Sequence, residues 1–178
     1  MAWRRIRDIA NRVSSNIEEE GVEMAKLTDE MMELVERQRL GFVATVCPDG
    51  TPNLSPKGTV CALDDERLIF ADIRSPGTVS NLRANPNIEV NVVDHFTRKG
   101  YRFKGTAQVL EVGADFERQV EFFSNRGMLD APRRIRAIVI VQVDQARPLI
   151  SPGYDILADE ASMRAYWLHH YVSEADAE

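Results

Sequence analysis

Polar side chains alternate with apolar or small ones between positions 53 and 60. The odd positions carry an amide, two hydroxyls and an ammonium: Asn53, Ser55, Thr59 and Lys57. The even positions carry apolar or small residues: Leu54, Pro56, Gly58 and Val60. Because strand side chains point alternately to opposite faces, the segment predicts a strand with one polar and one apolar face. The polar face would either bind a polar, anionic ligand or face solvent in an ordinary hairpin, and this stretch leaves both interpretations open.

A second candidate for anion binding follows at positions 74–86. Small residues open a short helix there, and Pro86 ends it. The first N–H groups of a helix have no acceptor within it, and together with the helix dipole they attract an anion. An ordinary capped turn would have the same residues. The position of this segment, soon after the polar strand, favours the phosphate interpretation.

Nucleophilic and metal chemistry find little support in the residue types. The two cysteines, Cys47 and Cys61, lie in apolar runs and are expected to be buried thiols of an intracellular protein. With the three histidines they form no metal-ligand spacing, so no metal site is predicted. No histidine–acid pair accompanies either thiol. His95 and Tyr101 are candidates for proton transfer, but the sequence assigns no catalytic residue.

Charge and hydropathy limit the partners. The chain has 178 residues and a formal net charge of −6, which does not favour nucleic acid. Positions 57–104, however, hold eight Lys or Arg and six Asp or Glu, a mildly basic segment that suits a small anionic ligand. No apolar run is long enough to span a bilayer, and none follows the N-terminal arginines as in a secretory signal. We therefore expect no membrane partner and a cytoplasmic protein.

Hydrophobic periodicity predicts a mainly β fold with flanking helices (α+β). An amphipathic helix is expected near the N-terminus, with Trp3, Ile6, Ile9, Val13 and Ile17 on one face. Further helices are expected at 28–39, 79–85, 114–123 and 159–171, and strands at 40–47, 51–63, 68–71, 88–93, 101–110 and 135–143. Six antiparallel strands with short turns predict a small closed or half-open barrel. The expected parts are an N-terminal helical extension (1–26), the barrel domain (27–147) and a C-terminal turn, helix and acidic tail (148–178).

Four stretches, in order, resemble the pyridoxamine 5′-phosphate oxidase-like family of FMN-binding split barrels. They are Gly41-Phe-Val-Ala-Thr-Val with the turn Pro48-Asp-Gly-Thr-Pro52, then Asn53-Leu-Ser-Pro-Lys-Gly58, then Ser75-Pro-Gly-Thr-Val-Ser-Asn-Leu-Arg-Ala-Asn-Pro86 leading into Ile88-Glu-Val, and Gly100-Tyr-Arg-Phe-Lys-Gly-Thr-Ala107. The resemblance covers roughly Met31 to Val143. Each stretch alone is a common strand or turn, and the specificity comes from their order and spacing.

The resemblance implies a homodimer that binds FMN in grooves between subunits and acts on a small-molecule substrate. It assigns phosphate contacts to Ser55, Ser75 and Thr78, and charge to Arg74. Lys57 would lie near the ring or the ribityl chain, and Arg102 or Lys104 would face the same groove. The complete set of implied cofactor-binding residues is Asn53, Ser55, Pro56, Lys57, Asp72, Arg74, Ser75, Gly77, Thr78, Asn81, Arg102 and Lys104.

The chain also departs from true pyridoxamine 5′-phosphate oxidases. Those enzymes have basic residues at positions that align with Ser55, Val60 and Thr78, and a basic C-terminal motif where this chain is acidic. Phosphate binding is therefore expected to be weaker or rearranged, and vitamin B6 chemistry is disfavoured. Tyr154 would either cap the flavin or belong to a plain turn.

The sequence leaves several functions open. An FMN-dependent oxidoreductase would pass hydride or electrons between a reduced nicotinamide, or another donor, and a small acceptor. A non-catalytic module could hold flavin, deazaflavin or haem on the same barrel as a sensor. An interaction protein that uses its first helix is a further alternative.

Overall fold

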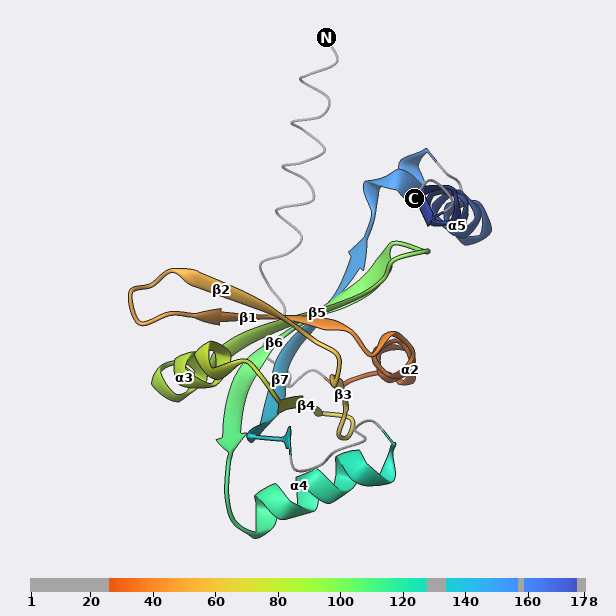
Figure 1. The fold of residues 1–178 in the computed structure, drawn as a ribbon. Coiled ribbons are helices and arrows are strands. Elements are labelled where there is room, and N and C mark those ends of the chain that lie inside the picture. Colours follow the sequence, from red (N-terminus) through yellow and green to blue (C-terminus); the bar gives the residue numbers. More distant parts are fainter. Residues whose placement is uncertain (1–25, 128–133, 157–158, 176–178) are drawn as a thin grey trace.

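The computed structural model describes residues 26–127, 134–156 and 159–175, and the expected N-terminal helix lies outside them. One antiparallel sheet curls into a half-barrel (Figure 1), with strand order β2-β1-β5-β6-β7-β4-β3. The strands are β1 (Gly41–Val46), β2 (Pro52–Lys57), β3 (Cys61–Ala62), β4 (Arg67–Asp72), β5 (Asn87–Asp94), β6 (Lys99–Leu110) and β7 (Ala137–Ile150). The helices are α2 (Asp29–Gln38), α3 (Pro76–Ala84), α4 (Ala114–Asn125), the short 3₁₀ helix η2 (Pro152–Asp155) and α5 (Glu160–Ala175).

The mainly β architecture with flanking helices is confirmed, but the sheet has seven strands and not six. The segment 51–63, expected as one strand, forms two. Its first half, β2, pairs with β1 at one edge of the sheet, and its second half, β3, pairs with β4 at the other edge. A turn at Gly58 and Thr59 separates them, because Val60 and Cys61 pack into the core while β2 continues the exposed edge.

The core lies on the concave side of the sheet. It is built from the inward-facing residues of the central strands, including Val43, Val90, Phe103 and Val141, all with 0% exposed surface. Alternation of buried and partly exposed residues along β5 matches the period expected for such a strand. Apolar burial on this scale is the main favourable contribution to folding.

Helix α2 covers one side of this core. It begins where the sequence predicts, since the Thr28 hydroxyl accepts a hydrogen bond from the Met31 N–H at 3.3 Å. Leu34 and Val35 are its buried residues and pack into the barrel core. Helix α3 lies on the opposite side of the barrel in Figure 1, against β1 and β6.

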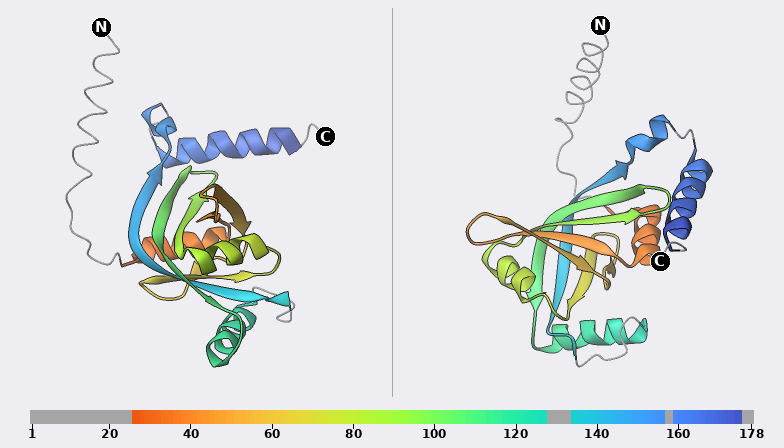
Figure 2. Two further views of the ribbon diagram at one scale, coloured as in Figure 1. Left: turned by 90° about the vertical axis from the view of Figure 1, so that its left-hand side faces the viewer. Right: turned by 45° about the horizontal axis from the view of Figure 1, so that its top comes forward.

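Helix α5 stands outside the barrel, beyond the β5–β6 turn (Figure 2). The turn holds it through two ion pairs, Arg164–Asp94 at 3.4 Å and Lys99–Glu160 at 3.1 Å. Asp94 also faces Arg37 of α2 at 3.7 Å, so one buried carboxylate connects both helices to the sheet.

Candidate functional site

A buried lysine at the end of β2 joins this strand to the start of α3. The Lys57 ammonium donates hydrogen bonds to the hydroxyls of Ser55 and Ser75, each at 2.6 Å, and only 4% of the residue is exposed. Burial lowers the pKa of Lys57, and the nearby charge of Asp72 acts in the opposite direction. The other three lysines, Lys26, Lys99 and Lys104, each face a carboxylate within 4 Å. Lys57 has hydroxyl partners instead, so its charge is compensated only in part.

The start of α3 leaves backbone donors free beside this lysine. Ser75 is the N-cap residue, but its side chain makes no capping hydrogen bond and accepts from Lys57 instead. The Ser75 N–H donates to the Asp72 carboxylate at 2.8 Å, which fixes the turn into the helix. The next N–H groups, of Gly77 and Thr78, belong to the first turn and have no acceptor within the helix. Gly77 is exposed and a Cβ there would meet no atom within 4 Å, whereas Thr78 is buried, with 2% of its surface exposed.

An amide–hydroxyl network holds β2, β1 and α3 together at Asn53, four residues before Lys57 in β2. The side-chain amides of Asn53 and Asn81 both donate to the Thr45 hydroxyl, each at 3.0 Å. Asn81 also approaches the Cys47 sulfur at 3.5 Å. These two predicted residues therefore position the site through Thr45. Thr45 was not among the predicted residues, because a single hydroxyl in an apolar strand gives no signal.

Three of the predicted residues lie on the other face of the sheet. In the strand register Pro56 pairs with Phe42, which shares a row with Asn91 and Arg102. Arg102 and Lys104 both face the Glu89 carboxylate, at 3.0 and 3.7 Å. Within one chain the structure therefore does not bring Pro56, Arg102 and Lys104 to the Lys57 cluster, because Ser55 and Lys57 point to the opposite side.

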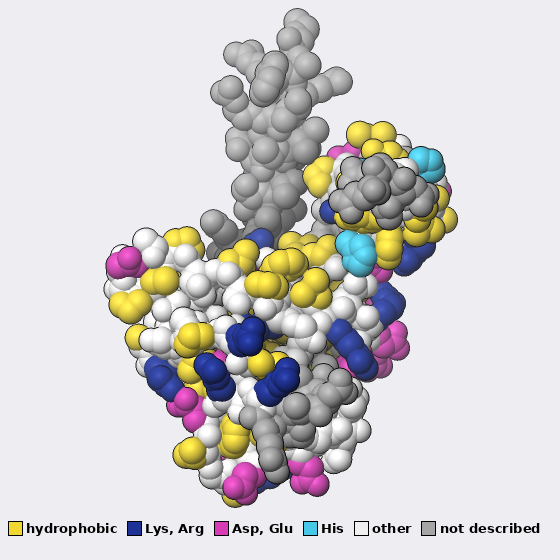
Figure 3. All heavy atoms as spheres, in the orientation of Figure 1, with side chains coloured by type: hydrophobic (Ala, Val, Ile, Leu, Met, Phe, Trp, Pro, Cys, Tyr) yellow, Lys and Arg dark blue, Asp and Glu magenta, His cyan; other side chains and the backbone are white. Residues whose placement is uncertain are grey.

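Two arginines outside the predicted set lie near the start of α3. Arg134 and Arg136 line a hollow of about 440 Å³ together with Arg74 and Ile73. The Arg136 N–H donates to the Asp72 carbonyl at 2.9 Å, which holds the entry into β7 against the end of β4. Figure 3 shows Lys and Arg side chains gathered between α3 and β4, the two elements that Arg74 connects. The signal available in the sequence was the alternation of arginines around Ile135.

The comparisons with known proteins identify the family. Residues 27–147 match the family model described as pyridoxamine 5′-phosphate oxidase. The chain belongs to this family. The crystal structure of HupZ from Group A Streptococcus is 34% identical, with a TM-score of 0.62 over 70% of this chain and 95% of that chain.

Two further similar proteins are more distant. An FMN-binding protein from Syntrophomonas wolfei is 14% identical, with a TM-score of 0.55 over 81% of this chain and 96% of that chain, and this likeness concerns the fold alone. An uncharacterized protein from Methanocaldococcus jannaschii is 30% identical over 95 residues. That match spans 52% of this chain and 62% of the length of the curated relative.

The donors near α3 suit a phosphate group. A partly compensated ammonium, a serine hydroxyl and free helix N–H groups are the usual ligands of a phosphate dianion. They lie at the end of a strand whose polar face points into the protein. Lys57 is buried whereas Leu54 on the other face is 64% exposed, so the polar face is not the solvent face of an ordinary hairpin.

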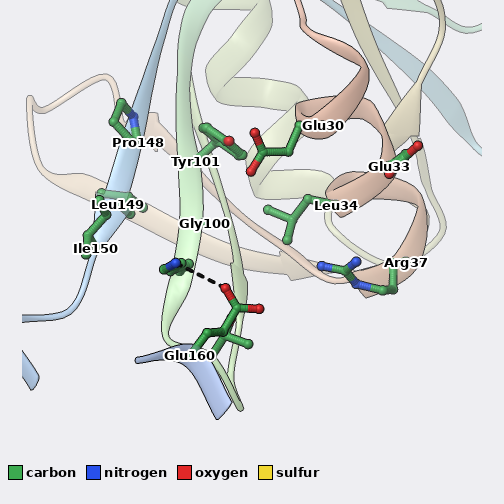
Figure 4. A pocket seen from close by; sticks show the side chains of 12 residues that line it. Glu30, Glu33, Leu34, Arg37, Gly100, Tyr101, Pro148, Leu149, Ile150 and Glu160 are labelled. Atoms are coloured by element: carbon green, nitrogen blue, oxygen red, sulfur yellow. Dashed lines mark hydrogen bonds and ion pairs between the residues drawn. The ribbon is translucent and has the colours of Figure 1, made fainter. Parts of the chain in front are cut away.

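A second cavity, of about 340 Å³, lies between α2, β6 and β7 (Figure 4). Tyr101 and Glu30 meet there, and burial, followed by the hydrogen bond to Glu30, raises the pKa of Tyr101. Tyr154 belongs to the neighbouring turn, where its hydroxyl donates to the Thr97 carbonyl at 2.7 Å. This contact supports the plain-turn interpretation of Tyr154. His95 is exposed and contacts the rings of Phe96 and Tyr171.

The two thiols differ more than the sequence suggested. Cys61 is fully buried, and burial, followed by the charge of Glu36, raises its pKa to about 12. Cys47 was expected to be buried but is only half-buried, because it follows β1 directly at the turn to β2. Among the described residues no three His, Cys, Asp or Glu side chains gather as metal ligands. In the same residues no helix is long and apolar enough to cross a membrane.

Proposed function

We propose that the chain is an FMN-binding flavoprotein whose cofactor phosphate lies at the start of α3. The observation that carries this proposal is the buried Lys57 ammonium, bound to the hydroxyls of Ser55 and Ser75 beside free helix N–H groups. In this arrangement Lys57 serves the phosphate end of the cofactor, whereas the family resemblance implies a position near the ring or ribityl chain. Asp72 keeps Ser75 in position, and the Thr45 network keeps β2 and α3 at a fixed distance.

We further propose that the protein is an oxidoreductase. Bound FMN would supply hydride or single-electron transfer between a reduced nicotinamide, or another donor, and a small-molecule acceptor. The chain would bind and orient the cofactor and leave the chemistry to it.

A second copy of the chain is the proposed partner. Exposed apolar side chains follow β1 and β2 across one face (Figure 3). Leu54 is 64% exposed, Phe42 43% and Val46 38%. Burying such a face against its equivalent would remove apolar surface from water at both subunits. Arg102 and Lys104 stay candidates for cofactor binding only in such a dimer, where they would reach a groove from the second copy.

The alternative is a non-catalytic module that holds a flavin, a deazaflavin or haem at the same barrel. The structure gives haem the least support, because the three histidines lie in α5 and the β5–β6 turn, and none lies in β2 or α3. His95 contacts Tyr171 of α5, and His170 contacts Trp167 within α5. His169 directly precedes His170 in the same helix. A flavin or deazaflavin phosphate would use the same donors as FMN.

The test is to titrate the purified protein into FMN and to follow flavin fluorescence and the visible spectrum. We expect quenching with saturation and a shifted flavin absorption band. Anaerobic NADH or NADPH should then bleach the bound flavin if the protein is an oxidoreductase. A protein that binds no FMN would overturn the flavoprotein proposal. A protein whose bound FMN stays oxidised with both nicotinamides and with chemical donors of similar potential would favour the sensor.

A further inference from the structure

We infer that Arg134 and Arg136, on the chain entering β7, supply the positive charge that makes this site prefer a phosphorylated flavin over an unphosphorylated one. This inference rests on the proposed flavin site and adds residues to it from a distant part of the sequence. The cofactor-binding residues that the family resemblance implies end at Lys104 and do not include these arginines.

The need for further cations follows from the charge near α3. A phosphate monoester carries about −1.5 to −2 charges at neutral pH. The buried cation at this end of β2 is Lys57, and two of its three N–H groups already donate to Ser55 and Ser75. Burial also lowers its pKa. One such ammonium leaves at least part of a dianion uncompensated.

The hollow at the turn between β4 and α3 would provide the missing charge. Arg74 directly precedes the N-cap residue Ser75, and it shares the hollow of about 440 Å³ with Arg134 and Arg136. Within the described part of the chain no carboxylate forms an ion pair with any of the three, whereas Arg83, for example, pairs with Glu111. Three guanidinium groups around one hollow repel each other, and an anion between them relieves this repulsion. Guanidinium groups also match the geometry of phosphate oxygens.

The two distant arginines are held at this place by the fold. Pairing of β4 with β7 sets Asp72 opposite Ala137, and the Arg136 N–H donates to the Asp72 carbonyl. Between the arginines, Ile135 is 8% exposed and packs with the apolar cluster around Phe123. Ile135 therefore anchors the segment, and the residues on both sides of it stay exposed at the hollow.

The test compares FMN with riboflavin, which has the same ring but no phosphate. The wild-type chain should bind FMN more tightly than riboflavin. The double variant Arg134→Gln with Arg136→Gln should weaken FMN binding by about tenfold to 100-fold, as expected for the loss of hydrogen bonds to a charged group. Riboflavin binding should change by less than about twofold in the same variant. Higher ionic strength should also weaken FMN binding more in the wild type than in the variant.

The matched control is Arg83→Gln with Arg118→Gln, which removes the same charge from exposed residues of α3 and α4. Because both arginines pair with exposed carboxylates, FMN affinity should stay within about twofold to threefold. Arg136→Lys keeps the charge and should retain most of the preference. If the wild type binds FMN and the Arg134/Arg136 variant binds it equally well, the inference is overturned while the flavin site stands. If the wild type binds neither flavin, the proposed function fails as well.

Discussion

Replacing Lys57 by Met should separate stability from cofactor binding. Met keeps the length and apolar character of the side chain but removes the buried ammonium. The variant loses two hydrogen bonds from a charged donor, to Ser55 and Ser75. It also removes a charge that is only 4% exposed and has no carboxylate partner within ion-pair distance among the described residues.

The two effects on stability oppose each other. Hydrogen bonds to charged groups contribute about 1.5–3 kcal/mol each. Desolvation of a buried ion opposes folding by several kcal/mol. We therefore expect the free energy of unfolding of Lys57→Met to stay within about 2 kcal/mol of the wild type.

The pKa shift of Lys57 fixes the direction in which stability changes with pH. Burial lowers the pKa of Lys57 below its usual 10.5, so between the folded and unfolded pKa values the unfolded chain holds a proton that the folded chain lacks. Wild-type stability should therefore rise with pH through this window, relative to Lys57→Met.

The effect on binding should be larger. Removing one partner of a buried, hydrogen-bonded charge pair weakens binding by about 2–5 kcal/mol. Since 1.4 kcal/mol is tenfold in affinity, the dissociation constant for FMN should rise at least about 30-fold. The measurements are a fluorescence titration with FMN and urea unfolding at several pH values. Lys26→Met is the control, because Lys26 is an exposed lysine paired with Asp65.

Two results would refute this reasoning. If Lys57→Met binds FMN as tightly as the wild type, the ammonium does not face the phosphate and the site is elsewhere. If the variant loses more than about 4 kcal/mol of stability, Lys57 serves mainly to hold β2 against α3, since removing a merely desolvated charge would not have this effect.

Three further predictions concern other parts of the chain. Gly77→Ala should leave the free energy of unfolding in urea nearly unchanged, since the added Cβ meets nothing within 4 Å. The same variant should bind FMN more weakly than the wild type. Equal binding would contradict a phosphate at the start of α3. Asp94→Asn should lower the free energy of unfolding by about 2 kcal/mol at pH 7. Burial raises the pKa of Asp94, but the N–H groups of Thr97 and Phe96 with two arginines bring it below 3.8, so the difference should vanish as the pH falls through the folded pKa. Leu54→Glu should yield a folded monomer in light scattering, unlike the control Val112→Glu; a persistent dimer would exclude this face.

Local patterns predicted much of the fold. Thr28 begins α2 as expected, and α3 lies between the predicted turn and Pro86. These features depend on residues close in sequence, where capping chemistry and periodicity act directly. The division of segment 51–63 was missed because both halves read as strand. Only their pairing with opposite edges of the sheet separates them.

The site was predictable in part for the same reason. Ser55, Lys57 and Ser75 were all among the predicted residues and the structure brings them together, but the contact between Lys57 and Ser75 spans 18 residues and depends on how β2 and β4 are placed. The face occupied by Arg102 depends on strand register, which a single sequence does not fix. The hollow formed by Arg74 and Arg136 requires the β4–β7 pairing, which joins positions far apart in the chain.

The prolines of β2 have a consequence for how copies of this chain can assemble. β2 is the last strand at one edge of the sheet, and Pro52 and Pro56 pair with Val46 and Phe42 of β1. Proline has no N–H, and in sheets it is tolerated where its nitrogen points away from the neighbouring strand. The free edge of β2 therefore lacks donors that another strand would need, which protects it from edge-to-edge aggregation. Strand addition at the β2 edge is therefore disfavoured, and a second copy that meets this region would meet it face to face.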